Sequence, residues 1–165
     1  MVFDNEDRQI KICINVLDVI KKYLQYDKRD SEAGGVLVGR VNISNNNLII
    51  EFATEPMPND KRSRNKFYRK DCGHIDFYQN LYQKYCGIYV YVGEWHTHPE
   101  AFPAYSTQDI LNWEIIGRNT GYASAQIHMI AGYSALRLWK FSHSSRSISD
   151  VITHSWNEDK KVWKA

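Results

Sequence analysis

Residues 88–98 read IYVYVGEWHTH, and this segment decides the fold that we expect. Its β-branched and aromatic residues are typical of a strand in the middle of a sheet. Side chains two positions apart on a strand point to the same face, so His96 and His98 would lie together while Trp95 packs into the core on the other side. The segment therefore predicts a central strand that ends at two neighbouring imidazoles.

A helix is expected soon after this strand. The loop between Pro99 and Pro103 leads to STQDILNWEIIG, residues 106–117, in which a serine precedes a helical run that ends near Gly117. In the other segments, apolar residues recur either at the spacing of a strand or at the spacing of a helix. They predict a strand over 8–14, a helix from an N-cap at Asn15 to about Tyr26, and a hairpin of SEAGGVLVGRV and LIIEFAT (31–41 and 48–54). A second helix is predicted with Gly87 at its C-cap and one face made of Ile75, Tyr78, Leu81, Tyr82 and Tyr85. A closing hairpin of AQIHMIAG and ALRLWKF (125–132 and 135–141) follows.

Two parts of the chain give weaker patterns. Residues 56–71, PMPNDKRSRNKFYRKD, hold two prolines and a dense group of Lys and Arg, which indicates a surface loop. The tail from Ser144 is too mixed for an element to be assigned. The remaining histidines are expected to be structural in a strand (His128) or to lie at helix starts or on the surface (His74, His143 and His154).

Composition limits the class of protein. A chain of 165 residues with 43% hydrophobic residues can bury one core, so we expect residues 1–165 to form a single domain. The formal charge of +2 gives no reason to expect nucleic acid or a membrane surface as an obligatory partner. The start of the chain lacks the zones of a signal peptide, no apolar run approaches the length of a membrane span, and Cys13, Cys72 and Cys86 suit reduced thiols, so we expect a cytoplasmic protein.

The residues around the two histidines suggest a metal site. Two imidazoles on one face suit zinc, which in catalytic sites commonly has three protein ligands and one open position. Asp109 is the nearest candidate for a third ligand, in the first turn of the expected helix. Ser106 and Asp109 also fit a capping box, in which both side chains satisfy free N–H groups at the start of a helix. From the residues alone, a metal ligand and a helix cap stay open as alternatives for Asp109, as do ordinary core or surface roles for the two histidines.

His-x-His, seven further residues and then Ser-x-x-Asp resembles the metal-binding signature of the JAB/MPN (Mov34, JAMM) metalloprotease family. The resemblance extends to SEAGGVLVGR at 31–40, to Pro99, and to the order of strands and helices. It implies an α/β (α+β) fold with a cytidine deaminase-like curved mixed β-sheet flanked by helices. It also implies that His96, His98 and Asp109 bind one catalytic Zn²⁺, that Ser106 helps to stabilise the oxyanion, and that Glu32 is the general base and acid.

The role of Glu32 depends most on this resemblance. Taken alone, Glu32 would be interpreted as an exposed acidic residue at the end of a strand. In the resemblance it accepts a proton from water and returns the proton to the departing amine.

The resemblance also implies a class of substrate. Members of the family cleave isopeptide or peptide bonds next to the C-terminus of ubiquitin or ubiquitin-like proteins. The length of this chain, PNDKRSRNKFYRKD (58–71) and GEWHTHPE (93–100) look most similar to stand-alone bacterial members found in antiphage operons. In the CBASS type, such a protease removes a nucleotidyltransferase that is conjugated through its C-terminus to other proteins, and this substrate is expected first. A bacterial ubiquitin-like or sulfur-carrier protein is an alternative substrate, and a metal-free MPN scaffold is an alternative function.

The basic residues between Lys61 and Lys70 allow two interpretations. They could hold an acidic face or the C-terminal carboxylate of the released protein, or they could be solvated charges of a loop. If they bind substrate, charge reversal at Arg62 and Arg64 would weaken turnover and leave zinc binding intact. Two aromatic residues interleave with them, but no nucleic-acid-binding motif is present, so nucleic acid is not an expected partner.

Overall fold

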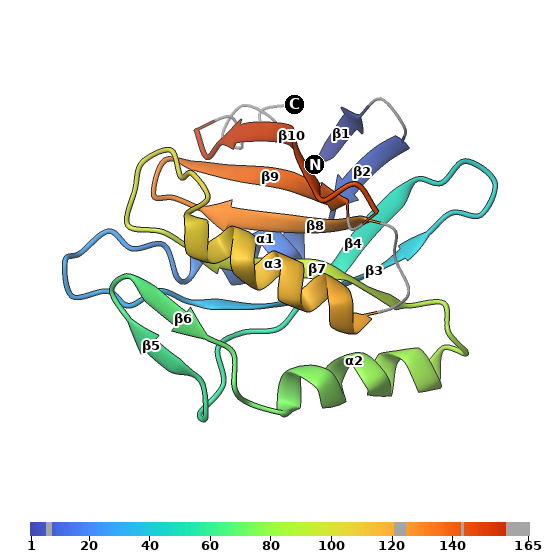
Figure 1. The fold of residues 1–165 in the computed structure, drawn as a ribbon, viewed down its shortest axis with the longest axis horizontal. Coiled ribbons are helices and arrows are strands. Elements are labelled where there is room, and N and C mark those ends of the chain that lie inside the picture. The colour runs from blue at the N-terminus through green and yellow to red at the C-terminus, as the bar shows by residue number, and fades with distance from the viewer. Residues whose placement is uncertain (6–7, 121–124, 143, 158–165) are drawn as a thin grey trace.

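The structure is a computed structural model that describes residues 1–5, 8–120, 125–142 and 144–157. Eight strands form one curved mixed sheet in the order β1-β2-β4-β3-β7-β8-β9-β10, and β5 pairs with β6 in a separate hairpin. Figure 1 shows α3 in front of the sheet and α1 behind it, with α2 along the lower side. The elements are β1 (Val2–Asn5), β2 (Arg8–Ile12), α1 (Ile14–Lys21), β3 (Gly34–Val41), β4 (Leu48–Ala53), β5 (Lys61–Ser63), β6 (Lys66–Tyr68), α2 (Gly73–Lys84), β7 (Val90–Thr97), α3 (Thr107–Thr120), β8 (Ala125–Ala131), β9 (Ala135–Ser142) and β10 (Ser147–Ser155).

Strand β7 lies in the middle of this sheet, as expected. It pairs antiparallel with β3 and parallel with β8, so the chain crosses over between β7 and β8, and α3 makes that crossover. Gly93 in β7 has a φ of 151°, and a Cβ at this position would collide with the carbonyl group of Ile127 in β8. A glycine is therefore needed in β7 shortly before His96.

Two apolar cores lie on opposite faces of the sheet. The larger one packs α1 against the sheet and includes Trp95, which is 1% exposed. The smaller one packs Trp113 of α3 against Trp139 and Phe141 of β9. Since neighbouring side chains on a strand alternate, Trp95 faces the α1 side and His96 faces the α3 side. This alternation confirms the expected position of Trp95 and directs the first histidine towards α3.

The fold class expected from the sequence is confirmed, but α1 differs from the prediction at both ends. Its N-cap is Cys13 rather than Asn15, and it ends at Lys21 rather than near Tyr26. The helix stops early because the side chain of Gln25 turns inward and donates to the carbonyl oxygens of residues 30 and 64. The buried amide therefore holds the following turn in place of a further helical turn.

The ends of α2 and α3 also differ from the prediction. The C-cap of α2 is Tyr85, and the left-handed residue after it is Cys86, with a φ of 51°. Gly87 comes one position later, where its N–H closes a Schellman motif around the end of α2. Helix α3 continues through Gly117 to Thr120, because a glycine weakens a helix without necessarily ending it.

Only part of the expected face of α2 is covered by the protein: Tyr78 and Leu81 are half-buried, and Tyr78 packs on Tyr91 of β7. His74, which was expected at a helix start or on the surface, begins α2 and is completely buried. The periodicity therefore located the helix correctly but only part of its buried face. Exposed residues on the expected face include Ile75, Tyr82 and Tyr85, at 50%, 45% and 40% exposure.

Four of the described strands were not expected from the sequence. One of them, β1, pairs with β2 at the edge of the sheet before the predicted first strand. Residues 56–71, interpreted as a loop, contain the antiparallel hairpin of β5 and β6. The tail forms β10, which pairs with β9 at the edge of the sheet. The three-residue strands β5 and β6 lie among basic residues, and the nine-residue β10 is mostly polar, so neither region shows a clear alternating apolar pattern.

The histidines outside β7 fall into different environments. His128 is buried in β8 and its ring stacks on Trp113, as expected for a structural residue. His154 in β10 is 9% exposed, so its interpretation as a surface residue is wrong. His143 lies outside the described residues. In the described parts of the chain, none of the helices has the length and apolar character needed to cross a membrane.

Candidate metal centre and active site

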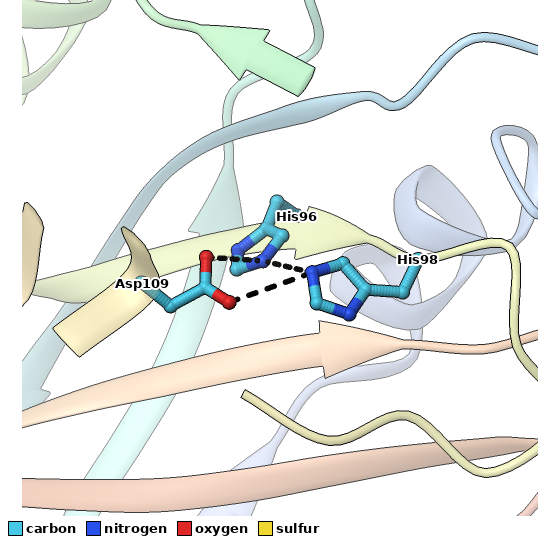
Figure 2. Close-up of side chains that lie close together, drawn as sticks. All are labelled: His96, His98 and Asp109. Atoms are coloured by element: carbon cyan, nitrogen blue, oxygen red, sulfur yellow. Dashed lines mark hydrogen bonds and ion pairs between the residues drawn. The ribbon is translucent and has the colours of Figure 1, made fainter. Parts of the chain in front are cut away.

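Three predicted ligands meet where β7 ends and α3 begins. His96 lies near the end of β7, His98 follows the strand, and Asp109 lies in the first turn of α3. Figure 2 shows the two rings and the carboxylate pointing towards one another. The two Nε2 atoms are 3.0 Å apart, and the Asp109 oxygens lie 3.2 Å from Nε2 of His96 and 3.6 Å from Nε2 of His98. The crossover from β7 to α3 thus brings together residues that the sequence separates by a loop.

The geometry of this cluster fits a zinc ion. Tetrahedral coordination with bonds of about 2.0–2.1 Å places neighbouring ligand atoms roughly 3.3–3.4 Å apart. The two Nε2 atoms at 3.0 Å, and Nε2 of His96 and Oδ1 of Asp109 at 3.2 Å, lie near that value, while Nε2 of His98 is 3.6 Å from the other oxygen, Oδ2. Two imidazoles and one carboxylate are also a ligand set found in catalytic zinc sites. The residues therefore fit the metal that the sequence motif implies.

The charges in the cluster favour binding of a cation. Burial lowers the pKa of His98 to about 4, and the charge of His96 acts in the same direction. The imidazole of His98 is therefore neutral at pH 7 and has an electron pair available for a metal ion. Burial opposes ionisation of Asp109, but its interactions with His96 and Ser106 hold the pKa of its carboxyl group well below the ordinary value. Asp109 in turn raises the pKa of His96 against the effect of burial. A metal ion bound between these groups would therefore compete with protonation of His96.

Ser106 and Asp109 form the capping box that the sequence allowed as an alternative. The N–H of Ser106 donates to Oδ2 of Asp109 at 2.6 Å, and the N–H of Asp109 donates to Oγ of Ser106 at 3.2 Å. The Ser106 hydroxyl group also donates to the same carboxylate oxygen at 2.7 Å. The carboxylate still faces both histidines, so the helix cap and the ligand position coexist in one residue. The cap fixes the Asp109 side chain where the cluster needs it.

Glu32 is buried, which contradicts its interpretation as an exposed acidic residue. It lies just before β3, is 6% exposed, and lines the same pocket as His96, His98 and Asp109. Burial raises the pKa of its carboxyl group to about 7, while the nearby charge of His96 acts against this rise. A carboxyl group with such a pKa can exchange a proton with water at neutral pH.

A pocket of about 340 Å³ contains these residues and extends away from them. One wall is formed by residues 65–69 around β6, and the other by the side of α3 that carries Gln108, Asn112 and Ile115. The lining also includes Glu94, Trp95 and His96 of β7 and His98 just after the strand. An extended segment of another protein could therefore approach the cluster between β6 and α3.

The basic cluster of residues 61–70 separates into side chains with different partners. Arg69 pairs with Glu94 of β7, and Arg64 donates to the carbonyl oxygen of Asp27. Arg62 donates to the carbonyl oxygens of the segment that contains Glu32. Sequence reasoning missed these contacts because their partners are 25 to 37 residues away and include backbone oxygens, which leave no pattern in the sequence.

Residues 18–142 match the family of prokaryotic homologs of the JAB domain, and this chain belongs to that family. The chain is also similar to proteins named CD-NTase/cGAS isopeptidase. The protein from Escherichia coli is 36% identical over 110 residues, which are 67% of this chain and 69% of that protein. The protein from Pseudomonas aeruginosa is 33% identical over 122 residues, or 74% and 76% of the two chains. The solution structure of protein DSY2949 from Desulfitobacterium hafniense has a TM-score of 0.60 over 86% of this chain and 88% of that one, and at 14% identity it supports the fold alone.

Proposed function

We propose that this chain is a zinc-dependent isopeptidase that releases a protein conjugated through its C-terminus, and that the released protein is a nucleotidyltransferase of the CD-NTase class in a CBASS antiphage system. The observation that carries the proposal is the group His96, His98 and Asp109, whose ligand atoms lie within 4.8 Å of one another in the pocket that Glu32 lines. Membership of the JAB family supports a hydrolytic role. Similarity to proteins named CD-NTase/cGAS isopeptidase supports this class of bond and substrate.

In this proposal the two imidazoles and the carboxylate of Asp109 hold one Zn²⁺, which when bound supplies a Lewis acid and makes water acidic enough to act near neutral pH. Glu32 accepts a proton from the attacking water and returns it to the departing lysine amine. Its pKa of about 7 suits both directions of that transfer. Ser106 donates its hydroxyl hydrogen to the oxygen of the scissile carbonyl, which requires the hydroxyl group to turn from the Asp109 oxygen that it now contacts.

The pocket suggests how the conjugate would lie. The C-terminal segment of the released protein would extend between β6 and α3, where Phe67 and Ile115 offer apolar contacts and Asn112 offers hydrogen bonds. We further propose that residues 1–165 act as one domain and that the reaction takes place in the cytoplasm, where the thiols of the free cysteines would stay reduced.

The proposal is tested by measuring conjugates in cells that carry the native operon. Wild type is compared with Glu32→Gln and with Glu114→Gln, a matched loss of one carboxylate on α3, and zinc is measured in each purified protein. We expect conjugates of the nucleotidyltransferase to accumulate only with Glu32→Gln, while all three proteins bind one zinc ion. The result would favour the alternative function as a metal-free scaffold if wild type binds no zinc even when zinc is added to the purified protein and the amount of conjugate is the same in all strains.

A further inference from the structure

The β5–β6 hairpin forms direct hydrogen bonds with the backbone of Glu32. The N–H of Glu32 donates to the carbonyl oxygen of Ser63 in β5 at 2.8 Å. In the opposite direction, Nε of Arg62 donates to the carbonyl oxygen of Glu32 at 2.6 Å, and a terminal nitrogen of Arg62 donates to the carbonyl oxygen of Ser31 at 3.0 Å. Both backbone groups of Glu32 therefore have their partners in β5.

The guanidinium group of Arg62 is held in place on its other side as well. It lies over the ring of Tyr23, with 5.4 Å between the guanidinium carbon and the ring centroid. The hydroxyl group of Tyr23 donates to Glu55 at 2.7 Å, which fixes that ring. An arginine fork matches two neighbouring carbonyl oxygens, and a lysine offers no equivalent planar pair of donors. Arg62 therefore has its partners within the protein, and the interpretation of this side chain as a contact for the released protein is not supported.

The same hairpin forms one wall of the pocket. Phe67 of β6 lines the pocket and packs on Gly34, where a Cβ would lie 2.6 Å from the ring. Gly34 is paired with His96 across β3 and β7. The hairpin thus contacts the chain at Glu32 through β5 and two residues later through β6. The β5–β6 hairpin therefore both forms a wall of the pocket and holds the backbone of Glu32.

We propose that Arg62 is a positioning residue that sets the place of Glu32 relative to the metal cluster by binding the carbonyl oxygens of Ser31 and Glu32. This inference rests on the proposed isopeptidase function. Arg62 touches neither substrate nor metal ligand in this scheme, and it acts on the reaction only through Glu32. Loss of its bonds would let the segment before β3 move, and an error of about 1 Å in a catalytic group can cost about 10² in rate.

The first test compares steady-state cleavage by wild type, Arg62→Ala, Arg62→Lys and Arg64→Ala. The substrate is the operon's nucleotidyltransferase joined through its C-terminus to the lysine of a dye-labelled peptide. Arg64→Ala is the matched control. Arg64 lies in the same hairpin and also donates to a backbone carbonyl oxygen, but to that of Asp27, away from Glu32. We expect kcat to fall about 10- to 100-fold in Arg62→Ala, with KM and zinc content within twofold of wild type. We expect kcat of Arg62→Lys to be at least about threefold below that of wild type. The kcat of Arg64→Ala should resemble that of wild type.

Two measurements that need no turnover separate positioning from substrate binding and from general loss of structure. In a Glu32→Gln background the conjugate stays uncleaved, and adding Arg62→Ala should change its Kd by less than about twofold. Hydrogen exchange at the amide of Glu32 should become about tenfold faster or more in Arg62→Ala, while exchange in β8 is unchanged.

Several results would overturn the proposal. They are a kcat within twofold of wild type in Arg62→Ala, an increase in KM or Kd that accounts for the loss, full activity in Arg62→Lys, or an equal loss in Arg64→Ala. If wild type itself does not cleave the conjugate, the proposed function fails. The exchange rate at Glu32 still decides whether Arg62 holds this segment, so the two failures can be told apart.

Discussion

The buried carboxyl group of Glu32, which transfers protons in the proposed reaction, opposes folding when it is ionised. With 6% of its surface exposed, the side chain is more stable as the neutral acid, and burial raises its pKa to about 7 from an ordinary value of 4.5. The folded protein therefore binds this proton more tightly than the unfolded chain does. Stability from this residue is fully present below about pH 4.5 and is lost as the pH rises through about 7.

This difference predicts the stability of Glu32→Gln. Glutamine removes the charge and keeps the shape, so the zinc-free variant should be more stable than zinc-free wild type at pH 8, by on the order of 3 kcal/mol, and equally stable near pH 4.5. Urea denaturation at both pH values, with a chelator present, measures this. Addition of zinc should shrink the advantage at pH 8, since a nearby cation favours the charged carboxylate. Equal stability of the two zinc-free proteins at pH 8 would show that Glu32 is solvated.

Ser106 combines two roles that substitution can separate. It caps α3 through Asp109, and in the proposed reaction it also donates to the oxyanion. Ser106→Ala should lose about 1 kcal/mol of stability through the cap and about 10²–10³ in kcat through the missing donor. Ser106→Thr keeps the hydroxyl group and should recover most of both. Thermal unfolding and steady-state kinetics of the two variants provide the measurement, and a loss of stability without loss of kcat would reduce Ser106 to a helix cap.

Sequence patterns predicted elements where one periodicity dominates. Strand β7 was predicted from its run of β-branched and aromatic residues, and the closing hairpin of β8 and β9 from two apolar segments on either side of Gly132. The hairpin of β5 and β6 was missed because its strands have three residues each, mostly charged or polar. Its structure depends on contacts such as those of Arg62 with residues 30 and 31 positions away, and no local pattern encodes such contacts.

Helix α2 and the β5–β6 hairpin depend on one buried pair. His74 contacts Thr54 at 2.5 Å and Asp60 at 2.9 Å, and the side chains of His74 and Asp60 are completely buried. The pair links the end of β4, the residues before β5 and the start of α2. Thr54, Asp60 and His74 come from three separate segments, which explains why the sequence suggested only a helix-start or surface position for His74.

His74→Ala should therefore destabilise the protein by about 2–4 kcal/mol, because the buried Asp60 would lose a partner that no solvent can replace. Asn80→Ala, an exposed position on the same helix, is the control and should change stability by less than about 0.5 kcal/mol. Urea denaturation gives both values. A cost below about 1 kcal/mol for His74→Ala would mean that the backbone N–H groups around Asp60 are sufficient by themselves.

On the scale of the whole molecule, the metal cluster connects parts that the sheet does not. His96 and His98 belong to β7 and its end, Asp109 belongs to α3, and α3 otherwise packs on the sheet mainly through Trp113. The motif predicted that these three side chains lie together, because their spacing matches a known signature. The position of Glu32 beside them depends on pairing between β3 and β7, and the sequence could suggest it only through resemblance.

Zinc should consequently stabilise the fold as well as the reaction. A ligand at 1,000 times its Kd stabilises the native state by about 4 kcal/mol, which for a chain of this size corresponds to a rise in Tm of roughly 8–16 °C. A chelator should lower the Tm of wild type by this amount and speed hydrogen exchange in the first turn of α3. In Asp109→Asn, the amide oxygen can still accept the N–H of Ser106, so the helix cap is kept while the charged ligand is lost. The Tm of this variant should lie near that of zinc-free wild type and respond little to chelator or to added zinc. An equally large response in Asp109→Asn would mean that the stabilising ion binds at other residues, and the link between β7 and α3 would then not depend on the metal.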